Sequence, residues 1–368
     1  MKPTRIAISG YYGFNNTGDE AVLAGIVKSL QIEADKRRIP IEIDVLSINP
    51  DITRSIHGTR ASHRYRLGPL AGSIAKCDLL LSGGGSLFQD VTSAHGIYYY
   101  AAVVRLAQML GKKTMFIAQG IGPLTNKRSL KLVAGVANRL DAITTRDTES
   151  MTLLREIGVD KPAVEVTADP ALILPELENR RRAAGDVLRI GVSLRPWAAD
   201  MDAVIDNIVA ALKTLETPVE IVPIAMQPES DRSVMNRFAE KCMNLPHAVI
   251  PISGAMPAPH LNEVIESISS CGLVIGMRLH ALILAAGAGI PSLAISYDPK
   301  VDSFMRASSQ ADYICRIDSP GDIPGRFKQL ADNRERQTDV LFDRAIEMRK
   351  SAMRNAGIAL DIIANKET

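Results

Sequence analysis

The chain has 368 residues, of which 46% are hydrophobic and 23% are charged. This length is more than one hydrophobic core usually supports, so we expect two domains, and the composition excludes a disordered chain. Its 43 basic and 41 acidic side chains give no bulk electrostatic reason to bind nucleic acid, so any anion site must be local.

The apolar run at residues 6–8 is too short for the apolar region of a signal peptide. The longest apolar stretch, residues 281–295, is interrupted by Gly287, Gly289 and Pro291 and is shorter than a membrane span. We therefore expect a cytoplasmic protein. The four cysteines lie too far apart for the spacing of zinc ligands, and we expect them to be buried thiols.

Short, almost continuously apolar runs alternate with helical patterns in the first half of the chain. Runs of this kind are typical of parallel strands that helices cover on both faces. A charged stretch without apolar periodicity, residues 175–186, is interpreted as a solvated linker. The strands predicted before it are residues 5–9, 41–48, 77–82, 114–118, 141–145 and 163–167.

The same alternation restarts after the linker, which predicts a second parallel sheet. Residues 339–364 have helical apolar spacing, and we expect this helix to pack back across the first domain. The prediction is an α/β protein with two Rossmann-like domains facing a cleft, at residues 1–178 and 187–338, followed by a helix at 339–368. The later strands are predicted at residues 189–194, 219–223, 247–251, 273–276, 292–296 and 313–316.

Ligands of such sheets bind beyond the carboxyl ends of the strands, so the residues that follow each strand are the candidates for chemistry. The loop at residues 10–20 has glycines that can bring backbone N–H groups to an anion or a sugar. Its spacing matches neither a dinucleotide fingerprint nor a P-loop. A tight loop capped by Thr17 or Asp19 is the alternative interpretation.

Three further strands of the first domain end in glycine-rich or charged loops. The loops are Gly83-Gly84-Gly85, then Gln119-Gly120-Ile121-Gly122-Pro123, and Arg146-Asp147. Consecutive glycines are entropically costly and indicate a close approach of the backbone. Either a ligand binds at these loops or the loops contact one another.

Cations follow the strands of the second domain. Arg278 and His280 come after one strand, Lys300 after another, and Arg195 after the first. Together with Arg146 they suit a small polyanion that carries both a phosphate and a carboxylate. A helix cap or a core position is the alternative for His280. No metal-ligand spacing and no nucleophilic serine elbow is present in the sequence.

Taken in order, the motifs resemble the polysaccharide pyruvyltransferase family, and more narrowly the bacterial cell-surface anchoring pyruvyltransferases, which modify secondary cell-wall polymers that hold S-layer proteins. The matching segments span most of both predicted domains. They are Gly10-Tyr11-Tyr12-Gly13 with Asn16-Thr17-Gly18-Asp19-Glu20-Ala21, Gly83-Gly84-Gly85, Gln119-Gly120-Ile121-Gly122-Pro123, Arg278-Leu279-His280-Ala281 and Ser296-Tyr297-Asp298-Pro299-Lys300.

The resemblance implies a fold of the glycosyltransferase-B type and a transferase that uses phosphoenolpyruvate as a substrate, without a cofactor or metal. It implies a pyruvate ketal across the 4- and 6-hydroxyls of an N-acetylmannosamine in a lipid-diphosphate-linked disaccharide, with phosphate released. The family's donor-binding residues match Arg278, Leu279, His280, Lys300 and Arg146, and we add Arg195 to this set.

A mechanism follows from the residue chemistry. Protonation of C3 of the enol ether makes C2 electrophilic, and His280 is our candidate acid, although it could instead only bind phosphate. Asp19 or Asp90 is the candidate to orient or deprotonate an acceptor hydroxyl, with capping and turn roles as alternatives. The acceptor contacts are expected in the first domain, which we interpret as the acceptor side. They are Tyr12, Asn16, Asp19, Gly84 and Asp90.

A lipid-linked acceptor implies weak peripheral contact with the inner leaflet of the plasma membrane. The basic and aromatic segment at residues 63–66 is interpreted as a solvated loop, and the three tyrosines at residues 98–100 mainly as core. A nucleotide-sugar-dependent glycosyltransferase and a sugar-binding protein without activity are the competing functions. The sequence indicates no oligomeric state.

Overall fold

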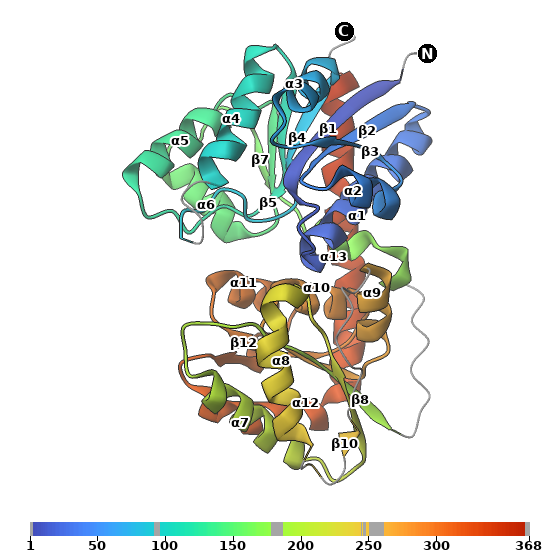
Figure 1. The fold of residues 1–368 in the computed structure, drawn as a ribbon, viewed down its shortest axis with the longest axis vertical. Coiled ribbons are helices and arrows are strands. Elements are labelled where there is room, and N and C mark those ends of the chain that lie inside the picture. The colour runs from blue at the N-terminus through green and yellow to red at the C-terminus, as the bar shows by residue number, and fades with distance from the viewer. Residues whose placement is uncertain are drawn as a thin grey trace. The chain divides into compact units, whose positions relative to one another are not determined.

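The computed structural model describes residues 3–91, 96–177, 187–243, 245, 248–249 and 261–364. The chain forms two compact units (Figure 1). Unit 1 consists of Met1–Phe14, Asp19–Ile173 and Met348–Thr368. Unit 2 consists of Asn15–Gly18 and Leu174–Glu347, so a short piece of the N-terminal loop belongs with the C-terminal half of the chain. The predicted class, α/β with two Rossmann-like domains, is confirmed.

Unit 1 is built on a parallel sheet whose described strands have the order β3-β2-β1-β4-β5-β6-β7. Its central strands are apolar on both faces; Leu79, Leu80 and Leu81 are all fully buried. Burial on both faces explains the continuous apolar runs in the sequence. The strands are β1 (Thr4–Tyr12), β2 (Ile41–Ser47), β3 (Arg60–His63), β4 (Leu79–Gly83), β5 (Lys113–Gln119), β6 (Ala142–Thr145) and β7 (Val164–Val166).

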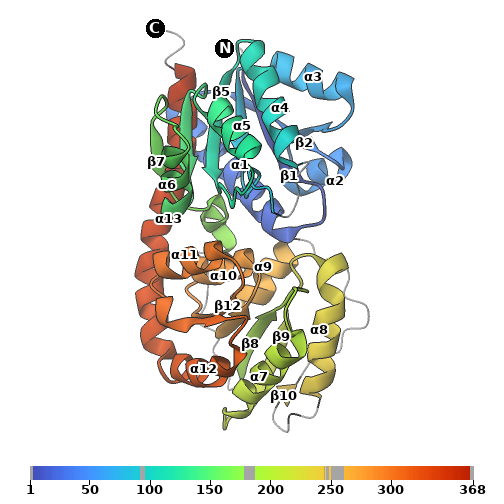
Figure 2. The ribbon, with the colours of Figure 1, turned by 90° about the vertical axis from the view of Figure 1, so that its left-hand side faces the viewer.

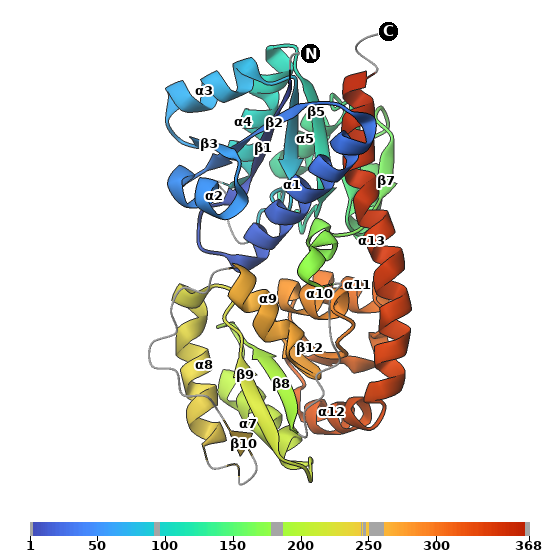
Figure 3. The ribbon, with the colours of Figure 1, turned by 90° about the vertical axis from the view of Figure 1, so that its right-hand side faces the viewer.

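Helices cover both faces of this sheet. One core cluster joins α3, α4, α5 and α6 to the strands, and Ile74, Tyr100, Val133 and Leu154 are among its members from these four helices. Figure 2 views unit 1 from the side of α4 and α5, and Figure 3 from the side of α1. The helices are α1 (Thr17–Arg37), α2 (Pro50–His57), α3 (Leu67–Lys76), α4 (Gly96–Met109), α5 (Lys127–Ala137) and α6 (Thr148–Glu156), with a 3-10 turn at Pro170–Ile173.

Unit 2 repeats the architecture with the described strand order β10-β9-β8-β11-β12-β13. The strands are β8 (Leu188–Ser193), β9 (Val219–Pro223), β10 (Ala248–Val249), β11 (Leu273–Gly276), β12 (Ser292–Ser296) and β13 (Ile314–Arg316). The helices are α7 (Met201–Lys213), α8 (Pro228–Cys242), α9 (Leu261–Ser269), α10 (Leu279–Gly287), α11 (Pro299–Ala307) and α12 (Ile323–Asp332). Helix α10 is almost entirely buried, as expected for residues 281–287.

The last helix, α13 (Arg334–Ala364), contributes its first part to unit 2 and its second part to unit 1. In unit 1 it is held by Asn355, which is 1% exposed. The Asn355 side chain accepts hydrogen bonds from Thr144 Oγ1 at 2.6 Å and Thr167 Oγ1 at 2.9 Å. The helix thereby packs against the ends of β6 and β7. No helix among the described residues is long and apolar enough to cross a membrane.

Two local predictions are wrong. The linker was predicted to start at residue 175, but Pro175–Leu177 forms a 3-10 turn with Leu177 buried, and residues 178–186 lie outside the described part. The segment at residues 63–66 is not simply a solvated loop, because it begins in β3 and Arg64 is only 2% exposed. The Arg64 guanidinium lies over four aromatic rings, which come from Phe14, Tyr65, Tyr99 and Tyr100.

Candidate active site

Three neighbouring strands of unit 2 bring polar side chains to one edge of its sheet. Strand β11 lies between β8 and β12, and adjacent parallel strands are about 4.8 Å apart. Arg195 follows β8, Arg278 follows β11 and Tyr297 follows β12. The Arg195 guanidinium donates a hydrogen bond to the Tyr297 hydroxyl at 3.0 Å, so these two side chains meet across the end of the middle strand.

Arg278 is held in place from within unit 2. Its Nε donates to Asp231 Oδ2 at 3.1 Å, its Nη2 donates to Ser230 Oγ at 2.7 Å, and Nη2 also pairs with Asp231 Oδ1. Asp231 is fully buried and also accepts from the backbone N–H of Gln227 at 3.0 Å. Nη1 of Arg278 makes no hydrogen bond within the described part of the chain. The guanidinium is therefore fixed on one side while Nη1 can serve an anion.

His280 lies at the start of α10, and the N-terminal loop packs directly against it. A Cβ atom added to Gly18 would lie 2.6 Å from Cγ and 2.9 Å from Cβ of His280, so only glycine fits. The loop is tied to unit 2 because the backbone N–H of Thr17 donates to the carbonyl of Met226 at 2.8 Å. Asn16 Oδ1 accepts from the Gly18 N–H at 3.1 Å. Asn16, which was expected in the first domain, therefore belongs to unit 2 and bonds to the glycine that lies against His280.

Two helix N-termini add positive potential at the same edge. Helices α10 and α11 begin directly after β11 and β12, and unpaired N–H groups at such ends attract anions. Asp298 caps α11 by accepting from the backbone N–H of Lys300 at 3.0 Å. Lys300 therefore lies in the first turn of α11. Leu279, predicted to bind the donor, has its side chain packed against the core of unit 2.

An aromatic pair that the sequence analysis did not select lies beside Arg195. The rings of Trp197 and Tyr297 have centroids 4.4 Å apart, and the Arg195 guanidinium lies 5.1 Å from each. Nε of Arg195 is buried without a hydrogen-bond partner among the described residues. The position of the only Trp just after a strand was the signal that could have identified this pair.

Arg146, which was expected among the donor-binding cations, lies in unit 1 and already has partners. Its Nη1 is 2.9 Å from Asp169 Oδ2 and its Nη2 donates to Ser86 Oγ at 3.0 Å. The side chain is 7% exposed. A Cβ on Gly120 would come within 3.3 Å of the guanidinium, so the glycine makes room for it. This guanidinium joins the loops after β4 and β6.

The glycine triplet and Tyr12 are explained by contacts within unit 1. Tyr12 is fully buried, and its hydroxyl donates to the Gly83 carbonyl at 2.9 Å. Burial, followed by the charges of Asp19 and Glu20, raises the pKa of Tyr12. Gly84 has φ +81°, and a Cβ there would collide with the Tyr12 hydroxyl. The two loops contact each other, which is one of the two alternatives left open by the sequence.

The two candidate carboxylates have different surroundings. Asp19 is 8% exposed, and a Cβ on Gly85 would lie 3.0 Å from its Oδ1. Asp90 accepts from the backbone N–H groups of Thr125 and Asn126, each at 2.9 Å. Burial alone would raise the pKa of Asp90, but these hydrogen bonds outweigh it and lower the pKa. Asp90 therefore holds the turn after β5, whereas Asp19 lies against the glycine loop.

The comparisons with known proteins agree with this architecture. The model of the family described as polysaccharide pyruvyl transferase matches residues 16–299. Amylovoran biosynthesis protein AmsJ of Erwinia amylovora is 22% identical in an alignment 425 positions long, gaps included, that covers 94% of this chain and 96% of AmsJ.

Two solved structures show the same fold. UDP-GlcNAc 2-epimerase from Neisseria meningitidis, bound to UDP-GlcNAc, has a TM-score of 0.62 at 13% identity and covers 99% of this chain and 100% of its own. MurG of Acinetobacter baumannii has a TM-score of 0.56 at 14% identity, and the match covers 98% of this chain and 100% of MurG. These similarities establish the glycosyltransferase-B type of fold. Because the family model spans most of the sequence, the chain belongs to the polysaccharide pyruvyl transferase family.

Proposed function

We propose that this transferase uses phosphoenolpyruvate to form a 4,6-linked pyruvate ketal on an N-acetylmannosamine of a lipid-diphosphate-linked cell-wall precursor. The observation that carries the donor assignment is that Arg195, Arg278 and His280 follow the carboxyl ends of the neighbouring strands β8 and β11 in unit 2. A phosphate and a carboxylate on one small molecule need several cations at short range. The acceptor follows from the resemblance of the motifs to the S-layer anchoring branch of the family.

Each donor-binding group has a distinct role in this proposal. Nη1 of Arg278 and the N–H groups at the start of α10 bind the phosphate, because they are fixed before the substrate arrives. Arg195 binds the carboxylate through its unpaired Nε, and Lys300 adds charge at the start of α11. His280 lies against Gly18 and supplies the proton. Preorganised charge of this kind favours the transition state over the free substrate.

The reaction balances in two steps. His280 donates a proton to C3 of the enol ether, which becomes a methyl group, while the first sugar hydroxyl bonds to C2 and gives up its proton to Asp19. The C2–O bond to phosphate then breaks, inorganic phosphate leaves, and the second hydroxyl closes the ketal as it gives its proton to His280, which became a base when it protonated C3. Arg278 and Lys300 stabilise the departing phosphate.

The test is phosphate release from phosphoenolpyruvate, measured with and without a synthetic lipid-diphosphate disaccharide. We expect acceptor-dependent release that falls at least about 100-fold in His280→Ala and Arg278→Ala. Lys328→Ala is the matched control, because this lysine is 59% exposed and, among the described residues, pairs only with Asp332. If phosphate release persisted in both variants, the donor site would not lie in unit 2 and the proposal would be wrong.

The competing function, transfer from a nucleotide sugar, is separated by ligand-induced thermal stabilisation. Phosphoenolpyruvate should raise the unfolding temperature of the wild type, and this shift should be lost in Arg278→Ala relative to Lys328→Ala. Stabilisation by uridine diphosphate but not by phosphoenolpyruvate would favour the glycosyltransferase and refute the proposal.

A further inference from the structure

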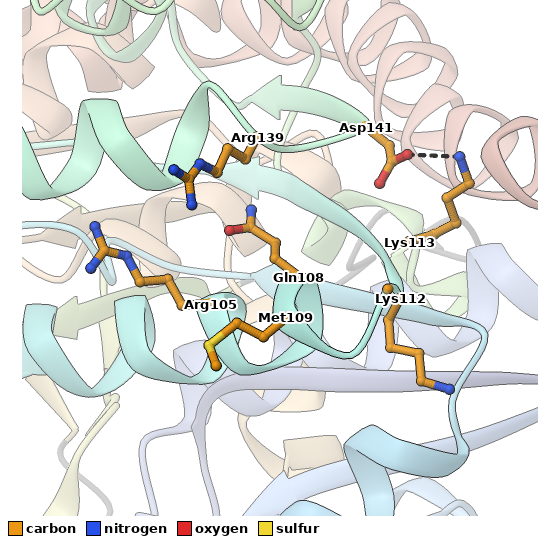
Figure 4. Close-up of a pocket in the computed structure, with 8 residues that line it drawn as sticks. Arg105, Gln108, Met109, Lys112, Lys113, Arg139 and Asp141 are labelled. Atoms are coloured by element: carbon orange, nitrogen blue, oxygen red, sulfur yellow. Dashed lines mark hydrogen bonds and ion pairs between the residues drawn. The ribbon is translucent and has the colours of Figure 1, made fainter.

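A pocket of about 680 Å³ lies at the amino ends of β5 and β6 in unit 1 (Figure 4). Its walls come from the last turn of α4, the loop from α4 to β5, and the loop from α5 to β6. Figure 4 shows Arg105 and Met109 projecting from α4 and Arg139 from the second loop. The charged residues that line it are Arg105, Lys112, Lys113, Arg139 and Asp141.

This pocket is separate from the loops discussed above. Lys113 is the first residue of β5 and Asp141 immediately precedes β6. The glycine loops and Arg146 follow the carboxyl ends of the same strands. Because the strands are parallel, the pocket and these loops lie at opposite edges of the sheet of unit 1.

The pocket has an excess of positive charge. Lys113 Nζ pairs with Asp141 Oδ1 at 2.8 Å, which uses the one carboxylate. Within the part of the chain that the structure describes, Arg105, Lys112 and Arg139 form no ion pair and no side-chain hydrogen bond. Three cationic side chains are therefore uncompensated around one depression.

Lys112 follows α4 but is not needed to cap it. The end of α4 is closed by its own backbone, because Gly111 has φ +65° and its N–H donates to the Gln108 carbonyl at 3.1 Å. The N–H of Lys112 donates to the Ala107 carbonyl at 2.9 Å. This is the glycine-terminated helix end, which satisfies the last carbonyls without side chains.

Two apolar side chains project into solvent beside the cations. Met109 is 83% exposed and Leu110 is 46% exposed. Exposed apolar side chains ringed by Lys and Arg are typical of surfaces that bind the interface of an anionic membrane. The segment at residues 63–66 is a poorer candidate, because Arg64 is buried under aromatic rings.

We propose that this pocket is the docking site of the protein on anionic phospholipids, with Arg105, Lys112 and Arg139 binding headgroup phosphates while Met109 and Leu110 enter the interface. The lipid surface is chosen over a soluble phosphate compound because the exposed apolar pair has no role in binding the latter. The inference deepens the proposed function and rests on its lipid-linked acceptor, which requires the enzyme to work at a membrane surface.

The test is co-sedimentation with vesicles of phosphatidylcholine, with and without about 30 mol% phosphatidylglycerol. We expect binding only to the anionic vesicles, weakened by high salt because screening shortens the range of the attraction. The variant Arg105→Gln/Lys112→Gln/Arg139→Gln should bind on the order of 100-fold more weakly, at roughly fivefold for each cation. Met109→Ser should weaken binding several-fold without a change of charge.

The matched control is Lys28→Gln/Arg155→Gln/Lys213→Gln, which removes three exposed cations elsewhere. It should bind like the wild type. Equal binding of the two triple variants, equal binding to neutral vesicles, or no vesicle binding would each overturn the proposal. If inorganic pyrophosphate raised the unfolding temperature of the wild type but not of the pocket variant, and no vesicles were bound, the pocket would instead be a site for a soluble phosphate ligand.

Failure of this inference can be told apart from failure of the proposed function. Vesicle binding needs neither donor nor acceptor. The pocket variant should keep wild-type phosphate release with an acceptor that carries a short, water-soluble chain, and should lose activity only with vesicle-embedded acceptor. Loss with both acceptors would place these cations in catalysis or folding and contradict a docking role.

Discussion

Asp231→Asn should destabilise unit 2 and disable the proposed donor site together. In the wild type both carboxylate oxygens receive donors, from Arg278, from the Ser230 hydroxyl and from the Gln227 N–H. An asparagine replaces one oxygen with an NH₂ group that faces these donors, and it leaves the guanidinium of Arg278 without a counter-charge. Asp231 is fully buried, so water cannot compensate.

The expected loss is about 3–5 kcal/mol, the usual cost of removing one partner of a buried ion pair. A change of 1 kcal/mol shifts the unfolding temperature by roughly 2–4 °C for a domain of this size, so the midpoint of unit 2 should fall by about 10 °C. Calorimetry resolves this shift. Phosphate release, measured well below the unfolding midpoint, should also fall, because Arg278 is no longer held in position.

The matched control is Asp206→Asn, which makes the same chemical change in an exposed ion pair. Asp206 is 63% exposed and pairs with Lys241 at 2.7 Å. Exposed pairs of this kind contribute little, so the control should leave the midpoint unchanged. If Asp231→Asn behaved like the control, the buried pair would not be what positions Arg278.

Three further outcomes are expected. Gly18→Ala should lower kcat/KM for phosphate release on the order of 100-fold, because Nδ1 of His280 is even closer to the added Cβ than Cγ at 2.6 Å and the ring must move by about 1 Å, whereas Gly72→Ala, which meets nothing, should be neutral. Unchanged kinetics in Gly18→Ala would contradict the placement of His280. Asn355→Ala should cost about 1–3 kcal/mol in denaturant unfolding, since it removes two buried hydrogen bonds that join α13 to β6 and β7, and a loss below about 0.5 kcal/mol would contradict this. Burial raises the pKa of Cys242 to about 12, so unfolding free energy should decline from about pH 9 upward as only the unfolded thiol ionises, and Cys242→Ala should flatten that decline. Identical slopes would show that this thiol is not the cause.

Much of the candidate site could be predicted from the sequence. Parallel strands buried on both faces require continuous apolar runs, and ligands of such sheets bind at the carboxyl ends of strands. These two rules identify Arg195, Arg278, His280 and Lys300 from local patterns alone. Their strands, β8, β11 and β12, were predicted almost at their observed bounds.

The partners of these side chains could not be predicted, because they come from distant parts of the chain. Asp231 lies 47 residues before Arg278, and its helix position looks like any solvated carboxylate. Arg146 was grouped with the donor cations on its charge, its place after a strand and the family resemblance, whereas Asp169, 23 residues later, already pairs with it. Charge is visible in a sequence, but compensation of charge is not.

The sequence by itself determined the fold class, the strands that carry the site and the residues at their ends, since each depends on local periodicity and glycine content. Only the tertiary structure decided what each residue contacts. Tyr12, expected at a ligand, and Arg64, expected in a solvated loop, are both buried. Asn16 and Gly18 belong to unit 2, where Gly18 lies against His280. The physical reason is that burial and close packing are made by segments far apart along the chain, and local patterns carry no information about which segments meet.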